Sequence, residues 1–208
     1  MHTDKFVALR GHLNKLRTVY LPGVFNPTGT YTATVYEKVR AYKVLAHAEM
    51  EAYFEEVALS IAQKAYQKWT SARKASTPLL SIVAYHETPF PSIPDIHDAN
   101  NADKDIDWRI TTSYTGYNKY VRSFNHGIKE KNILNIFLPL GIRVDDIDND
   151  LLIALNNFGS ERGLIAHSSR SGAQSLTTPD DALASVNNIM TYIASFDEFL
   201  HSYRSAIR

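Results

Sequence analysis

The feature that most constrains this fold is the stretch from residue 31 to residue 77, which contains neither glycine nor proline. Apolar residues recur along it at helical spacing, among them Val39, Ala46 and Val57. The stretch predicts one helix of about forty residues, roughly 60 Å long. Thr34 and Glu37 resemble a capping box, so this long helix is expected to start close to Thr34.

Four further segments also show helical patterns. The first carries Phe6, Leu9 and Leu13 as an apolar stripe. The last follows Thr178 and a proline, a common N-cap and first-turn pair. With the long helix they give a bundle of about five helices. The four segments are residues 4–20, about 116–138, about 149–167 and about 179–200.

The segment between the second and third predicted helices has a different composition. Residues 76–115 contain four prolines and many Asp and Asn residues, so we expect an irregular insertion there. Its apolar residues suggest that it packs on the helices, so the chain is predicted to be one domain over residues 1–208. These apolar residues are Leu79, Leu80, Ile82, Val83, Phe90 and Trp108.

Composition excludes several kinds of protein. The chain has 208 residues, 44% of them hydrophobic, which is enough for one substantial core. It has no cysteine and no apolar run long enough to span a bilayer, and it starts without a secretory signal pattern, so we expect a soluble cytoplasmic protein. The formal net charge is zero, so any site for a phosphate must be local.

The most reactive combination of residues follows Phe158. Arg162 is a fixed cation suited to a phosphate, and His167 can exchange a proton near neutral pH. An arginine followed closely by a histidine is a weak motif, and Arg40 with His47 also matches it. The position of Arg162 and His167 at the end of a helix, beside a polar loop, distinguishes them and favours phosphodiester chemistry.

Two glycines precede His167. Gly159, Gly163 and His167 fall four residues apart, so they form one strip along a helix in which two positions lack a side chain. Such a strip lets another helix approach closely. If that helix comes from a second subunit, Gly159 and Gly163 are dimer contacts and two Arg/His pairs meet in one cleft. Tight packing inside one subunit explains the spacing equally well.

Polar residues at helical spacing form two other candidate surfaces. His47, Glu51 and Glu55 make a ridge on the long helix, which is either a solvated face or a support for the site. The second surface is a basic strip, either solvated or facing RNA. Its residues are Lys119, Arg122, His126 and Lys129.

The helical pattern, the long helix with its Leu45-to-Glu55 segment and the Arg162-to-His167 motif before the last helix together resemble the HEPN superfamily, and within it the RiboL-PSP-like group. The resemblance covers most of the chain apart from the insertion. It implies an all-α, HEPN-like helical bundle. Many active HEPN proteins carry a polar residue directly after the arginine, where this chain has Gly163, and some carry a tyrosine where it has Ser169.

The resemblance implies a metal-independent endoribonuclease without a cofactor, usually a homodimer, found in toxin–antitoxin and phage-defence (antiviral) systems. RNA and a cognate antitoxin or defence-system protein are the expected partners. On this resemblance His167 would act as general acid or base and Arg162 would stabilise the transition state, and Glu161 would either orient one of these side chains or simply be exposed. His47 and Glu51 are possible supporting residues. Residues expected to hold RNA phosphates are Arg170, Lys119, Arg122 and Lys129.

Two other functions stay open. The first is a catalytically inactive HEPN-like module that binds a partner protein or RNA through the same cleft, which Gly163 and the neutral charge favour. The second is a carboxylate-bridged metal enzyme, which needs Glu-x-x-His pairs on two helices. Only Glu198 with His201 fits that spacing, so this function is disfavoured.

Overall fold

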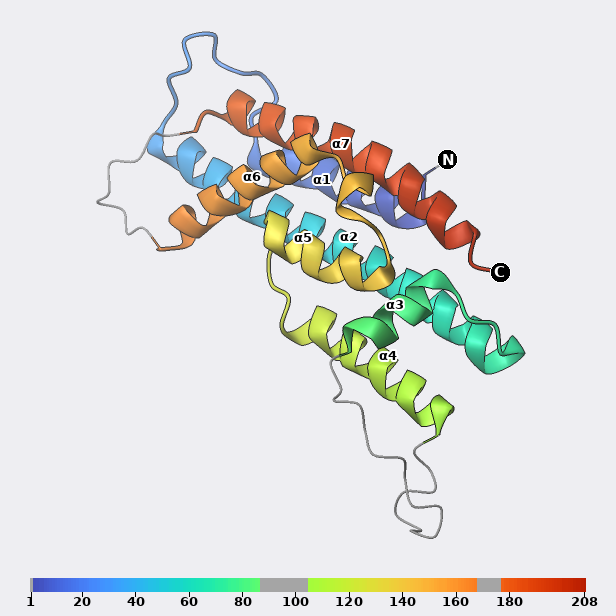
Figure 1. The fold of residues 1–208 in the computed structure, drawn as a ribbon. Helices are drawn as coiled ribbons and strands as arrows, with labels where there is room; N and C mark the ends of the chain where they lie inside the picture. The colour runs from blue at the N-terminus through green and yellow to red at the C-terminus, as the bar shows by residue number, and fades with distance from the viewer. Residues whose placement is uncertain (1, 87–104, 168–176) are drawn as a thin grey trace.

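The computed structural model describes residues 2–86, 105–167 and 177–208, with residues 162–167 described by their backbone alone. These residues form seven α-helices and two short 3₁₀ turns and contain no strand, which confirms the all-α prediction (Figure 1). The predicted number of about five helices was too low. The helices are α1 (Asp4–Tyr20), α2 (Ala33–Ala72), α3 (Thr77–Tyr85), α4 (Ile106–Ser123), α5 (Glu130–Phe137), α6 (Asn149–His167) and α7 (Pro179–Ser205), and the turns are η1 (Leu138–Leu140) and η2 (Val144–Asp146).

Helix α2 has 40 residues, as its uninterrupted sequence predicted. Its start differs from the prediction, because Thr32 is the N-cap and makes no side-chain capping bond. The expected box partner Glu37 instead forms an ion pair with Arg40 at 3.6 Å. The helix ends where Arg73 takes a left-handed conformation, with φ of 53°.

The other helices pack around α2, which contributes fourteen buried residues to the core. Helices α1 and α6 lie antiparallel to its N-terminal half, and α7 runs parallel to it (Figure 1). Helices α3 and α4 pack on its C-terminal half, where Tyr66 stacks on Tyr114 of α4 with ring centroids 4.2 Å apart. Each half of α2 therefore has its own set of neighbours.

The predicted irregular insertion is largely helical where the structure describes it. Pro78 lies in the first turn of α3, a position that proline tolerates, and Leu79 and Ile82 are buried. Asp105 caps α4 by accepting a hydrogen bond from Trp108 N at 2.9 Å. The packing prediction holds for Leu79 and Ile82, whereas Leu80 is exposed. Trp108 is exposed as well, and Phe90 lies outside the described residues.

The single helix predicted from about residue 116 to residue 138 is two helices. Helix α4 ends at Ser123 and α5 starts at Glu130. Between them Gly127 has φ of +111°, which other residues rarely adopt, and Ile128 is fully buried. The Gly127 N–H donates to Glu51 Oε1 at 2.5 Å, so the connection is held against α2.

Helices α6 and α7 begin where the sequence predicted. Asp148 accepts a hydrogen bond from Asp150 N at 2.8 Å before α6, and Thr178 caps α7 by accepting one from Asp181 N at 3.3 Å. Helix α6 reaches His167, at the end of the bundle where α2 starts (Figure 1). Among the described helices, none combines the length and apolar character needed to cross a membrane.

Candidate active site

Helix α6 carries the Arg/His motif in its last two turns. The backbone stays helical through His167, so Arg162 and His167 lie about 140° apart around the helix axis. Gly159, Gly163 and His167 share one face of this helix, as their spacing predicted. The structure thus gives the backbone positions of the motif, and the roles of Arg162 and His167 stay predictions.

Two side chains of α2 pack directly beneath the turn of α6 that precedes Arg162. Lys43 is only 3% exposed, and its Nζ forms an ion pair with Glu161. The same Nζ lies 5.8 Å from the centroid of the Phe158 ring. Because an unpaired buried ammonium is costly, these partners account for a lysine at a core position. Glu161 is therefore held by an ion pair, although half of its side chain is exposed.

The predicted polar ridge on α2 is not a solvated face. His47 is 3% exposed, and its ring lies nearly parallel to that of Phe158, with centroids 6.5 Å apart. His47 Nδ1 lies 3.6 Å from Glu51 Oε2, and Glu51 also holds the Gly127 N–H. The ridge therefore connects α6 to the loop between α4 and α5, and the supporting role of His47 and Glu51 stays a prediction.

Further along α2 the acidic ridge meets basic residues. Burial raises the pKa of the Glu55 carboxyl, and the neighbouring Glu51 raises it further. The neighbouring His126 and Arg122 side chains oppose this rise in the pKa of Glu55. Arg122 therefore lies close enough to the acidic face of α2 to interact with it.

The break between α4 and α5 divides the predicted basic strip. Lys119 and Arg122 are exposed on α4, whereas Lys129 is the N-cap of α5. A Cβ atom built on Gly159 would lie 3.0 Å from Lys129 Cγ, so Lys129 packs against α6 instead of extending the α4 strip. Arg170 lies outside the described residues. RNA binding by all four residues stays a prediction.

The contact with Lys129 also bears on the glycine strip. Gly159 is buried, and its lack of a side chain makes room for Lys129 within the same chain. This is the intramolecular packing that the spacing left open as an alternative. Contacts of Gly159 and Gly163 with a second subunit stay predictions.

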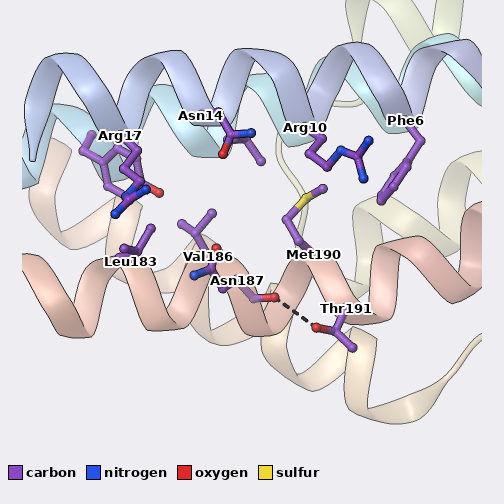
Figure 2. A pocket seen from close by; sticks show the side chains of 11 residues that line it. Phe6, Arg10, Asn14, Arg17, Leu183, Val186, Asn187, Met190 and Thr191 are labelled. Atoms are coloured by element: carbon purple, nitrogen blue, oxygen red, sulfur yellow. Dashed lines mark hydrogen bonds between the residues drawn. The ribbon is translucent and has the colours of Figure 1, made fainter.

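A groove of about 290 Å³ lies between α1 and α7, on another side of the N-terminal half of α2. Figure 2 shows Arg10, Asn14 and Arg17 of α1 along one wall, opposite Asn187 and Thr191 of α7. The core closes the groove from beneath, since buried Tyr42 is among its lining residues. This groove was not predicted from the sequence.

Lys43 is the site residue that the sequence patterns missed. The helical pattern of α2 carried a signal for it, because Lys43 is four residues before His47 and thus on the same face. A lysine four residues from a histidine is nevertheless common on solvated helices. Only the partners on α6 distinguish this buried pair. Among the described residues, no three His, Asp or Glu side chains are grouped so as to hold a metal ion.

Comparison with known proteins gives one match. The family model described as RiboL-PSP-HEPN matches residues 27–202, which is most of the chain. Neither the comparison with curated proteins nor that with solved structures found a significant match. The matched range includes α2 and α6, and therefore both helices of the candidate site.

Proposed function

The chain belongs to the RiboL-PSP-HEPN family, and on this premise we propose that it is a metal-independent endoribonuclease that uses Arg162 and His167. HEPN domains are helical bundles that are generally related to ribonucleases. In the proposed reaction the RNA 2′-oxygen attacks the adjacent phosphorus while its proton passes to a base. The bond from phosphorus to the 5′-oxygen breaks, that oxygen takes a proton, and a 2′,3′-cyclic phosphate remains.

The two motif residues have complementary roles in this reaction. His167 serves as the general base or the general acid, since its ordinary pKa lies near neutrality. Arg162 supplies a fixed positive charge for the phosphorane-like transition state. No step needs a metal ion or an organic cofactor.

The observation that supports this proposal is the anchoring of α6 on α2 directly before Arg162. Glu161 is paired with Lys43, and Phe158 stacks on His47. A catalytic side chain gains from a backbone that is fixed before the substrate binds, because misplacement by about 1 Å can cost a hundredfold in rate. We assign Lys43, His47 and Glu51 to positioning the end of α6, outside direct contact with RNA.

We further propose that two chains form a homodimer through the last turns of α6. Gly163 is the position where we place the subunit contact, since Gly159 already packs on Lys129 within the chain. A two-fold arrangement would bring two Arg162/His167 pairs into one cleft. On the family resemblance we also propose a toxin–antitoxin or phage-defence setting, with a protein partner that restrains the nuclease.

The test is incubation of the purified protein with mixed RNA in EDTA. Wild type should release fragments that end in a 2′,3′-cyclic phosphate, and Arg162→Ala or His167→Ala should abolish their release. Arg143→Ala and His201→Ala are matched controls, because Arg143 lies directly before η2 and His201 lies on α7, both outside α6, and they should cleave like wild type. Cleavage that survives either motif substitution refutes the assignment.

Gly163 favours a second function, a catalytically inactive module that binds RNA or a partner protein through the same cleft. Gly163 stands where many active HEPN proteins carry a polar residue. If wild type binds RNA in EDTA without cleaving it, and His167→Ala does not change the affinity, the result supports the binding-module function and refutes the nuclease function. The variant Gly163→Asn, which places a polar residue after Arg162, should then be tested for a gain of RNA cleavage.

A further inference from the structure

A second and larger cleft lies on the other half of the molecule, between α3, α4 and the segment from α5 to η1. Its volume is about 690 Å³, within the usual range for small-molecule sites. We call it the aromatic cleft. It is lined by Ile82, Tyr85, His86, Ser113, Gly116, Tyr117, Lys119, Tyr120, Phe124, Leu134, Asn135, Leu138 and Pro139.

Aromatic rings dominate the accessible part of this cleft. Phe124 is 64% exposed and Tyr85 is 56% exposed, which is unusual for side chains of this size. Tyr120 also lines the cleft and is half-buried. Tyr117 is buried, and its hydroxyl donates to Ile136 O at 2.7 Å, so it fixes the wall of the cleft. Three rings with accessible surface therefore line the cleft, Tyr85 from the end of α3 and Tyr120 and Phe124 from the end of α4.

The base of the cleft depends on a glycine in the middle of α4. A Cβ atom on Gly116 would lie 3.2 Å from Cδ2 and 3.3 Å from Nε2 of His86. Glycine in a helix interior costs about 1 kcal/mol relative to alanine. At Gly116 the missing side chain lets the His86 ring lie directly on α4.

Polar groups at the rim match a nucleotide. Lys119 is exposed, and its Nζ lies 6.0 Å from the centroid of the Phe124 ring, so a cation adjoins a stacking surface. Asn135 is half-buried in the lining, and an amide can both donate to and accept from a base edge. Rings beside cations are the arrangement that binds single-stranded nucleic acid.

We propose that the aromatic cleft is a subsite for single-stranded RNA, in which Phe124 and Tyr85 stack on a base and Lys119 contacts its phosphate. This assignment rests on the proposed function, because it makes the cleft a part of the substrate site away from the α6 motif. It names the substrate class as RNA that is unpaired at the bound nucleotide. A duplex keeps its bases stacked on each other and so cannot occupy the cleft in this way.

The experiment measures binding of a labelled single-stranded RNA to the full chain by fluorescence anisotropy. His167→Ala serves as the background, so that the RNA stays intact. In this background Phe124→Leu and Lys119→Ala should each weaken binding about tenfold, in line with the loss of one stacked base or one charge contact. Phe124→Tyr keeps the ring and should bind normally. Lys131→Ala is the lysine control, since Lys131 is exposed on α5 and outside the cleft lining.

Each outcome decides the assignment. The assignment is overturned if Phe124→Leu and Lys119→Ala bind the RNA as tightly as the His167→Ala background does. It is also overturned if a duplex of the same length binds as tightly as the single strand. Thermal melting of every variant separates lost binding from lost folding, and Phe124→Tyr gives a ring-retaining comparison. If wild type cleaves no RNA but binding still depends on Phe124 and Lys119, the subsite stands and the proposed nuclease falls. If wild type cleaves and the cleft variants bind and cleave normally, the subsite alone falls.

Discussion

The carboxylate of Asp197 on α7 is the polar group whose removal should destabilise the fold most. It is fully buried and accepts a hydrogen bond from Tyr53 OH at 2.8 Å. It also accepts from Thr3 N at 2.8 Å and from Thr3 Oγ1 at 2.5 Å. His2 Nδ1 lies 3.4 Å from the same carboxylate. One side chain therefore joins α7, α2 and the cap of α1.

The expected cost follows from these contacts. A hydrogen bond to a charged group contributes about 1.5–3 kcal/mol. In Asp197→Ala the Tyr53 hydroxyl loses its partner inside the core, whereas the half-buried Thr3 groups regain part of their bonding from water. The summed loss should be about 3–5 kcal/mol, a large share of the 5–15 kcal/mol that is typical for a domain.

Urea unfolding followed by circular dichroism measures this loss. Tyr53→Phe removes one hydroxyl and keeps the ring, so it should cost about 1.5–3 kcal/mol. The double variant Asp197→Ala with Tyr53→Phe should cost less than the sum of the two single variants, because both remove the same bond. A loss below about 1.5 kcal/mol for Asp197→Ala, or strict additivity in the double variant, would refute this account of the buried carboxylate.

Three further predictions concern the helix packing. Lys43→Met should change the free energy of unfolding by less than about 1 kcal/mol, because water hydrates the Glu161 carboxylate once its partner is gone. The same variant should cleave RNA about tenfold more slowly than wild type, because α6 loses its anchor on α2. A variant that cleaves RNA as fast as wild type would contradict this role of Lys43. Gly159→Ala should leave the sizing-column mass unchanged, because Lys129 can move aside; loss of a dimer would place Gly159 at the interface. Burial raises the pKa of Tyr42 to about 12 despite nearby Arg17. The Tyr42 hydroxyl ionises at pH ~10 in the unfolded chain and only near pH 12 in the folded chain. The free energy of unfolding should therefore fall as the pH rises from ~10 to 12. Urea midpoints measured over this range should fall less in Tyr42→Phe than in wild type.

The parts of the fold that sequence patterns predicted are those set by local rules. The length of α2 follows from the absence of glycine and proline, and the start of α7 follows from Thr178 and Pro179. The break at Gly127 was missed because apolar spacing continues across it, through Ile128. A tertiary contact, the hydrogen bond from Gly127 N to Glu51, holds this break against α2.

The candidate site was predictable in part for the same reason. Arg162 and His167 stand out by residue type and spacing, and the structure confirms that they share a helix end. Burial of Lys43 and His47 was not predictable, because a helix pattern does not record which neighbour covers a polar face. That neighbour is the Phe158 turn of α6, which meets α2 only in the folded chain.

The continuous helix α2 also links the two proposed RNA sites. His47, which stacks on Phe158 of α6, lies one turn before Glu51, and Glu51 holds the Gly127 N–H three residues after Phe124 of the aromatic cleft. The rise along α2 from His47 to Glu51 is about 6 Å. One turn of α2 therefore supports both the α6 anchor and one end of the aromatic cleft, so a change at Glu51 should disturb both proposed sites at once.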